Sequence, residues 1–122
     1  MAESLFERYG GIDTVREIVA EFYERVLDSA QLHPYFEKAE MGPLIDHQAQ
    51  FIAALMGGPP SFTDEQLHRV HASLDVTQED FVEMAGILQE TMEDFDLAFD
   101  DVDIVMQAFR AKQPLIVAGR AH

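Results

Sequence analysis

The chain has no cysteine, no tryptophan and few basic residues. Without cysteine it forms no disulfide and offers no thiolate nucleophile or zinc–thiolate site. Only 8 lysines and arginines stand against 23 aspartates and glutamates, which gives a formal net charge of −15 at pH 7. Because such a surface repels phosphate backbones and anionic lipid, we expect neither nucleic acid nor a membrane as a partner.

Long apolar segments are also absent. No apolar run approaches the length of a bilayer span, and the first residues do not have the pattern of a signal peptide. We therefore expect a cytoplasmic monomer, with one domain over residues 1–122, which is long enough to bury a sizeable core. Six methionines and nine phenylalanines indicate a soft aromatic interior, which suits a large flat apolar guest as well as ordinary packing.

Helical signals recur along the whole chain. Capping-box signatures precede stretches of helical periodicity, and they begin at Ser4, Thr14, Thr63 and, in a weaker form, Thr77. The predicted helices are a short one before Gly10-Gly11, 14–27, 43–56, a short one around His71, 77–95 and 101–117. We expect Pro114 to kink the last of these. No stretch alternates with period two for long enough to form a strand, so the predicted fold class is all-α.

His71 is the first candidate functional residue. Leu67, Val70 and Leu74 form an apolar stripe at helical spacing, and His71 lies about 40° from the axis of that stripe. Its imidazole is therefore expected to point into the interior, where an unpartnered polar group costs on the order of 1–3 kcal/mol. Either the imidazole is bonded to a backbone carbonyl, as in an ordinary core histidine, or it binds a ligand.

Further polar side chains are expected to face the interior from two other helices. Gln48 and His47 lie about 40° and 60° to either side of the apolar stripe of the 43–56 helix. Tyr23 lies about 80° from the axis of the stripe on the 14–27 helix. Gln48 would serve equally well as a bridge between two helices, so this observation alone does not define a site.

Together these residues are what a haem pocket requires. A neutral imidazole donates a lone pair to iron, and a phenol and an amide on the opposite wall donate hydrogen bonds to a bound diatomic gas. A catalytic triad fits poorly, because cysteine is absent and the serines occupy caps, turns or helix ends. A non-haem metal site on His68 and His71 lacks a carboxylate at the required spacing. An all-α interaction module without a cofactor is a further alternative.

The sequence resembles the truncated haemoglobins, and specifically group I of that family. The matching segments are Leu5–Gly11 (LFERYGG), Phe22–Leu27 (FYERVL), Tyr35-Phe36, His47-Gln48, Gly57-Gly58-Pro59, Val70–Thr77 (VHASLDVT) and Phe81. They cover nearly the whole chain in the family's order and spacing. The resemblance implies a globin-like two-over-two helical sandwich around haem b.

The resemblance also implies a role for each residue that matches the family's pocket. His71 corresponds to the proximal iron ligand and Tyr23 to the distal tyrosine. Leu44 and Gln48 correspond to distal positions one helical turn apart, where they line the gas site. Phe36 corresponds to the aromatic residue that wedges the haem. Other apolar residues are expected to face the haem, namely Met41, Phe51, Ile52, Leu67, Val76, Phe81 and Leu88.

Two features of the family vary between its members. In some, a histidine at the position of His47 ligates the iron when no gas is bound. We expect His47 either to act as such an exchangeable sixth ligand or to lie at the haem edge. Some relatives also attach a haem vinyl group covalently through a histidine in the last helix. The residue that best matches here is near Gln113, so we expect non-covalent haem.

The resemblance implies reversible binding of O₂, NO or CO, in oxygen binding and transport or in protection against NO. An enzyme of another class, a nitric oxide dioxygenase that converts NO to nitrate, is the main alternative, and it needs an electron donor such as a reductase. Peroxidase-like or electron-transfer chemistry is a third possible function. Iron ligation by His47 would favour it, because haem with two imidazole ligands binds gas poorly.

Overall fold

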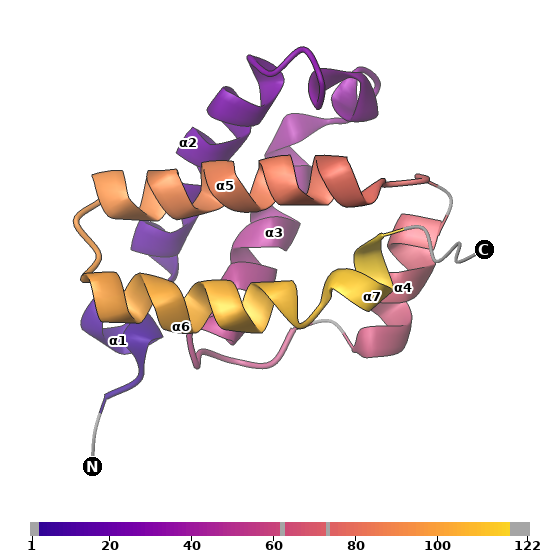
Figure 1. Ribbon diagram of the computed structural model, residues 1–122. Helices are drawn as coiled ribbons and strands as arrows, with labels where there is room; N and C mark the ends of the chain where they lie inside the picture. The colour runs from indigo at the N-terminus through magenta and orange to yellow at the C-terminus, as the bar shows by residue number, and fades with distance from the viewer. Residues whose placement is uncertain (1–2, 62, 73, 118–122) are drawn as a thin grey trace.

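The computed structural model describes residues 3–61, 63–72 and 74–117, which form helices joined by short turns with no strand among them (Figure 1). In chain order the elements are α1 (Leu5–Arg8), α2 (Ile12–Leu27), the 3₁₀ helix η1 (His33–Phe36), α3 (Met41–Leu55), α4 (Asp64–Ala72), α5 (Gln78–Asp94), α6 (Phe99–Arg110) and α7 (Gln113–Ile116). The all-α prediction is confirmed. Within the described part of the chain, no helix is long and apolar enough to span a membrane.

The longer helices form two crossed pairs. α2 packs against α3, and α5 packs antiparallel against α6 (Figure 1). Contacts of α2 with α5, and of α3 with α6, join the two pairs. At one end of this sandwich, α4 packs against the short α7. The helix that carries His71 is therefore held on the fold mainly by the last described helix.

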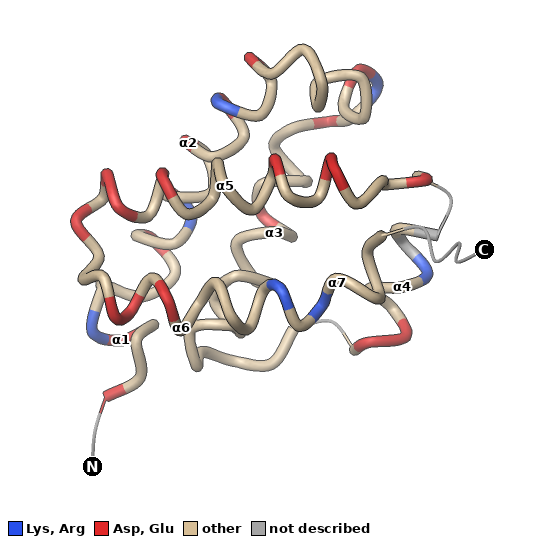
Figure 2. The backbone as a smooth tube through the Cα atoms, in the orientation of Figure 1, with Lys and Arg blue, Asp and Glu red and all other residues tan. Residues whose placement is uncertain are grey.

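α2 shows why the sequence produces these helices. The residues of its predicted apolar stripe are all buried, and they are Val15, Ile18, Val19, Phe22 and Val26. This spacing of three and four residues places every apolar side chain of the stripe on the face that meets α3 and α5. Most acidic residues are exposed, Asp101 being a buried exception, and Figure 2 shows acidic positions along α5 and α6, with Arg110 at the end of α6 as the basic position of these two helices.

Three of the four predicted capping sites, those at Ser4, Thr63 and Thr77, are confirmed, whereas the 43–56 helix starts two residues earlier than predicted, at Met41. At Ser4, the side-chain oxygen accepts a hydrogen bond from the Glu7 amide (3.1 Å), and the Glu7 carboxylate accepts one from the Ser4 amide (3.2 Å). Thr63 and Gln66 make the same exchange before α4. The Thr77 hydroxyl accepts a hydrogen bond from a backbone amide in the first turn of α5. These bonds, reciprocal at Ser4 and Thr63, satisfy amides that have no partner within the helix.

The predicted start of the second helix at Thr14 is wrong. α2 begins at Ile12 after Gly11, whose φ of 77° is a conformation that residues with a side chain rarely adopt. The Gly11 amide donates to the Phe6 carbonyl (2.9 Å), which closes α1, and the Gly11 carbonyl accepts from the Val15 amide (3.2 Å) in the first turn of α2. Thr14 therefore lies inside the helix instead of capping it.

The predicted last helix over 101–117 is two helices. It begins earlier, at Phe99, and α6 ends at Arg110, before α7 starts at Gln113. Pro114 has no amide hydrogen to donate to the carbonyl four residues before it, which belongs to Arg110, and its ring crowds that carbonyl. The proline thus breaks the helix one turn upstream instead of kinking it.

Candidate functional site

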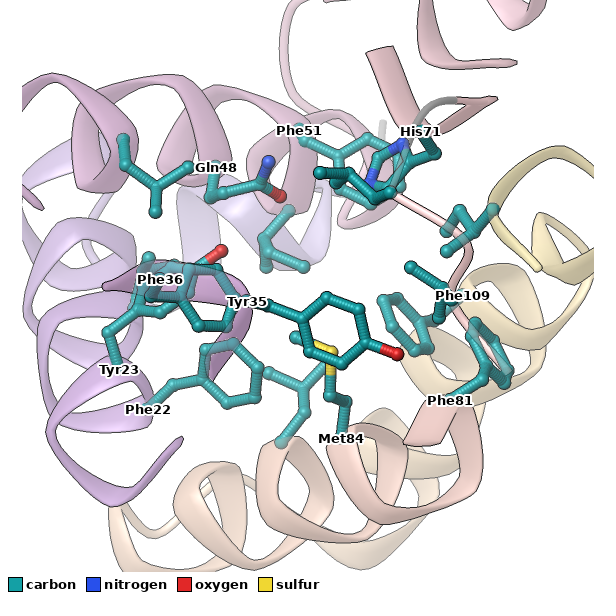
Figure 3. Close-up of a pocket in the computed structure, with 17 residues that line it drawn as sticks. Phe22, Tyr23, Tyr35, Phe36, Gln48, Phe51, His71, Phe81, Met84 and Phe109 are labelled. Atoms are coloured by element: carbon teal, nitrogen blue, oxygen red, sulfur yellow. The ribbon is translucent and has the colours of Figure 1, made fainter. Parts of the chain in front are cut away.

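A largely apolar cavity lies between α2, η1, α3, α4, α5 and the last two helices (Figure 3). The empty space at this site is about 880 Å³, a figure that includes solvent at its open side. Four residues with polar groups line it, and they are Tyr23, Tyr35, Gln48 and His71. All other lining residues are aliphatic, aromatic or methionine.

His71 lines this cavity from α4 and is half-buried. Its Nδ1 lies 2.9 Å from the carbonyl oxygen of Leu67, one turn earlier in α4, and must donate in that bond because a carbonyl only accepts. The tautomer with its proton on Nδ1 leaves the lone pair on Nε2. The two sequence-based explanations for His71, a bond to a backbone carbonyl and binding of a ligand, are therefore compatible. The bond from Nδ1 to the Leu67 carbonyl leaves Nε2 able to bind a ligand. The side chain of its stripe neighbour Val70 lies outside the described structure.

Tyr23 is more deeply buried than its place at the edge of the α2 stripe predicts. Only 4% of it is exposed, because Phe36 from η1 covers it. Its ring packs edge-on against Phe22 (centroids 4.9 Å apart) and against Phe36 (5.5 Å). Burial raises the pKa of the Tyr23 phenol, so the hydroxyl keeps its proton and acts as a donor. It makes no hydrogen bond to any residue that the structure describes.

Gln48 lines the cavity from α3, with Leu44 one turn before it. The Gln48 side chain is half-buried, and like the Tyr23 hydroxyl it has no hydrogen-bond partner among the described residues. Figure 3 shows the Tyr23 hydroxyl and the Gln48 amide pointing into the same part of the cavity, with His71 on the other side of it. Two donors thus face one imidazole across an apolar space.

His47 does not join them. Its side chain is exposed and does not line the cavity, so the prediction that it faces inward is wrong. The reason is the rotation of α3, which directs Leu44, Gln48 and Phe51 to the cavity. His47 precedes Gln48 and is turned by about 100° from it, which places His47 at the edge of that face, where its side chain is exposed.

The apolar residues predicted to face the haem mostly line the cavity. Those that do are Phe36, Phe51, Ile52, Val76, Phe81 and Leu88. Leu67 and Met41 do not. Leu67 is buried in the core and contributes its carbonyl to His71, and Met41 is half-buried in the first turn of α3.

Sequence reasoning missed several wall residues. Met84, Phe109 and Ile116 belong to predicted apolar faces, but periodicity does not tell which part of a face borders a cavity. Phe109 stacks on Phe81, with centroids 5.2 Å apart and planes within 7°. Tyr35 had a weaker signal, its place beside Phe36 in the corner before α3, and the other additions are Val19, Phe22 and Leu74.

The cavity fits haem better than a bare metal ion. Within residues 3–61, 63–72 and 74–117, no group of three or more histidines and carboxylates is arranged to hold a metal. A single imidazole with a free Nε2 suffices when the metal brings its own ring of ligands, and aromatic and aliphatic walls suit the faces of that ring. The two unpartnered donors have the chemistry needed for a small ligand on the opposite side.

Comparison with known proteins agrees with this geometry. Residues 4–115 match the model of the bacterial-like globin family. A group 1 truncated haemoglobin of Mycolicibacterium paratuberculosis is 30% identical over 118 residues, which cover 97% of this chain and 87% of that protein. The chain belongs to the group 1 truncated haemoglobins.

Solved structures show that this truncated haemoglobin has the two-over-two fold. The 2/2 haemoglobin of a Synechococcus species, solved in the cyanomet state with covalently attached haem, is 25% identical with a TM-score of 0.87. The two structures match over 97% of this chain and 100% of the other. A truncated haemoglobin from Tetrahymena pyriformis in the Fe(III) form shares the fold at 17% identity, with a TM-score of 0.85 over 94% of this chain and 98% of that one. The truncated haemoglobin described here is thus a haem-binding globin.

Proposed function

We propose that the protein holds haem b non-covalently through His71 and reversibly binds a diatomic gas, O₂ foremost and also NO and CO. The observation that carries this proposal is the His71 imidazole, whose Nδ1 is engaged by the Leu67 carbonyl (2.9 Å) and whose Nε2 is left to bind iron. Haem supplies the iron at which the gas binds. The polypeptide supplies the proximal ligand, the apolar walls and the distal donors.

Tyr23 and Gln48 are proposed to hold the gas. Both side chains lack hydrogen-bond partners among the described residues, so neither has to break a bond within the protein before it donates to a guest. A diatomic ligand that carries partial negative charge accepts such hydrogen bonds, which are stronger in an apolar cavity than in water. Leu44 adds only apolar contact, so the hydrogen bonding depends on Tyr23 and Gln48.

Reversible gas binding is tested on the purified protein loaded with haem and reduced under nitrogen. We expect the absorption spectrum to shift on addition of O₂ or CO and to return when the gas is removed. A protein that takes up no haem, or whose reduced form gives the same spectrum with and without gas, would contradict the proposal.

We further propose that His47 does not ligate iron in the resting protein, because its side chain is exposed and lies outside the cavity. The ligand-free ferrous protein should then give a five-coordinate, high-spin spectrum. A six-coordinate, low-spin spectrum that disappears in His47→Ala would instead establish an exchangeable sixth ligand, and apparent gas affinity would be reduced by the closed fraction.

Haem attachment is proposed to be non-covalent. The family resemblance implies that a covalent link uses a histidine of the last helix, at a position near Gln113 here, and the Gln113 side-chain amide donates a hydrogen bond to the side chain of Gln78. An amide does not add to a vinyl group as an imidazole does. Extraction with acid and ketone should therefore remove all of the pigment, and pigment that stays with the protein would show a covalent bond.

Oxidation of NO to nitrate is a second candidate, favoured by the two unpartnered donors on one side of the cavity. Continued turnover would need an external electron donor, such as a reductase. Stopped-flow mixing of the O₂-saturated ferrous protein with NO distinguishes the candidates. Fast oxidation with one nitrate formed per haem supports the dioxygenase, and slow or absent oxidation leaves gas binding alone.

A further inference from the structure

A side-chain network connects the corner before α3 to the start of α5. The Tyr35 hydroxyl donates a hydrogen bond to one carboxylate oxygen of Asp80. Gln31 Nε2 donates to the other oxygen at 2.6 Å. The Asp80 amide in turn donates to the Thr77 hydroxyl (3.1 Å), which caps α5. A single carboxylate therefore joins two residues from around η1 to a helix 45 and 49 residues further along the chain.

This network lies at the rim of the haem cavity. Tyr35 lines the cavity, and both it and Asp80 are half-buried, which places their bond between the cavity and solvent. Figure 3 shows the Tyr35 ring extending across the cavity from the side of Phe36 toward that of Phe81. The next residue, Phe36, packs edge-on against Tyr23, so the position of η1 also determines how the distal tyrosine is packed.

The bond between Tyr35 and Asp80 is of a strong type. Burial and the bond to Asp80 raise the pKa of Tyr35, and the bonds from Tyr35 and Gln31 lower the pKa of Asp80. Near neutral pH the phenol therefore keeps its proton and the carboxylate keeps its charge. The first turn of a helix also favours a negative charge. Hydrogen bonds to an ionised acceptor are about twice as strong as neutral ones.

We propose that Tyr35 and Asp80 form a latch that holds η1 closed over the cavity and sets the rate at which haem is lost. This inference rests on the proposed haem binding. Haem that leaves past Tyr35 requires η1 to move away from α5, and that movement breaks the bond to Asp80. Tyr35 is a positioning residue in this scheme, because it acts by holding the corner.

The latch is tested with variants that remove one polar group each. Tyr35→Phe keeps the ring and deletes the hydroxyl, and Asp80→Asn removes the charge that accepts its bond. Each should speed the transfer of haem to an excess of apomyoglobin by about ten-fold or more. The double variant should lose haem no faster than the faster single variant, because both changes break the same bond.

Tyr9→Phe is a matched control. The Tyr9 hydroxyl also donates to an aspartate at the start of a helix, Asp101 in α6 (2.6 Å), but Tyr9 does not line the cavity. This variant should lose haem at the wild-type rate. Equal acceleration in Tyr9→Phe and Tyr35→Phe would show a general loss of stability and would overturn the latch, as would a wild-type rate in Tyr35→Phe.

Amide hydrogen exchange on the haem-free protein gives a second measurement. The amides of Tyr35 and Ala39 donate to carbonyls within the corner, those of Leu32 and Phe36, both at 3.1 Å. They should exchange faster in Tyr35→Phe than in the control variant. Unchanged exchange would overturn the latch whether or not haem binds. A wild-type protein that takes up no haem would overturn the proposed function instead, and the exchange result would still decide the latch.

Discussion

Replacing Tyr23 by phenylalanine separates the role of its hydroxyl from that of its ring. The ring contributes packing against Phe22 and Phe36, with centroid distances of 4.9 Å and 5.5 Å, and phenylalanine keeps both contacts. The hydroxyl contributes no hydrogen bond to the described residues of the haem-free protein. The substitution therefore removes one donor from the cavity and leaves the core intact.

The two consequences differ in size. The free energy of unfolding of the haem-free protein should change by less than about 1 kcal/mol, because phenylalanine keeps the ring contacts and the deleted hydroxyl has no hydrogen-bond partner among the described residues. With gas bound, the lost hydrogen bond to a partly charged acceptor is worth about 1.5–3 kcal/mol. That difference corresponds to O₂ dissociation that is about ten- to a hundred-fold faster.

Two assays measure these quantities. Displacement of O₂ by CO in a stopped-flow instrument gives the dissociation rate, and urea unfolding of the haem-free protein gives the free energy of unfolding. Gln48→Leu is a useful comparison, since it removes the second donor from the same side of the cavity. If Tyr23→Phe releases O₂ at the wild-type rate, the assignment of Tyr23 as the distal donor is wrong. If it unfolds more easily, the hydroxyl has a structural partner.

Three further predictions concern the stability of the fold. Phe81→Ala removes a ring that is 2% exposed and stacked on Phe109, so it should lower the free energy of unfolding by about 3–5 kcal/mol in urea titration. Asp80 has a pKa below its ordinary value of 3.8, so its contribution is present above that pH and disappears as the pH falls through the lowered pKa. The difference in stability between wild type and Asp80→Asn should shrink accordingly in acid. Lys112→Met breaks a largely exposed ion pair with Asp64 (2.8 Å) and should change stability by less than about 1 kcal/mol.

Helical periodicity was sufficient to predict most of the fold. The stripe on α2 is buried at every predicted position, and the caps at Ser4 and Thr63 begin helices where the sequence places them. The predicted helix boundaries were wrong where the backbone conformation of glycine or proline determined them more strongly than the pattern of side chains. Gly11 starts α2 before Thr14 does, and Pro114 acts on a carbonyl a full turn upstream.

The candidate site could be predicted in part. His71 and Gln48 line the cavity as predicted. Both were expected at only about 40° from the axis of an apolar stripe, so a modest error in the rotation of either helix does not move them off the inner face. His47, at a larger angle, did not line it. Tyr23 is buried in part by Phe36 of η1, and Tyr35 is held at the rim by a bond to Asp80 in a distant segment. Contacts of this kind depend on how elements pack together, which local periodicity does not describe.

The central claim, that His71 holds the haem through Nε2, is tested most directly by the iron–histidine stretching band in the resonance Raman spectrum of the ligand-free ferrous protein. We predict that the wild type shows this band, that the exposed-histidine variants His47→Ala and His68→Ala keep it, and that His71→Gly loses it together with most of its haem. Added imidazole should restore haem binding and the band in His71→Gly. A band that persists in His71→Gly without imidazole, or that is lost in either control variant, would contradict the assignment of His71.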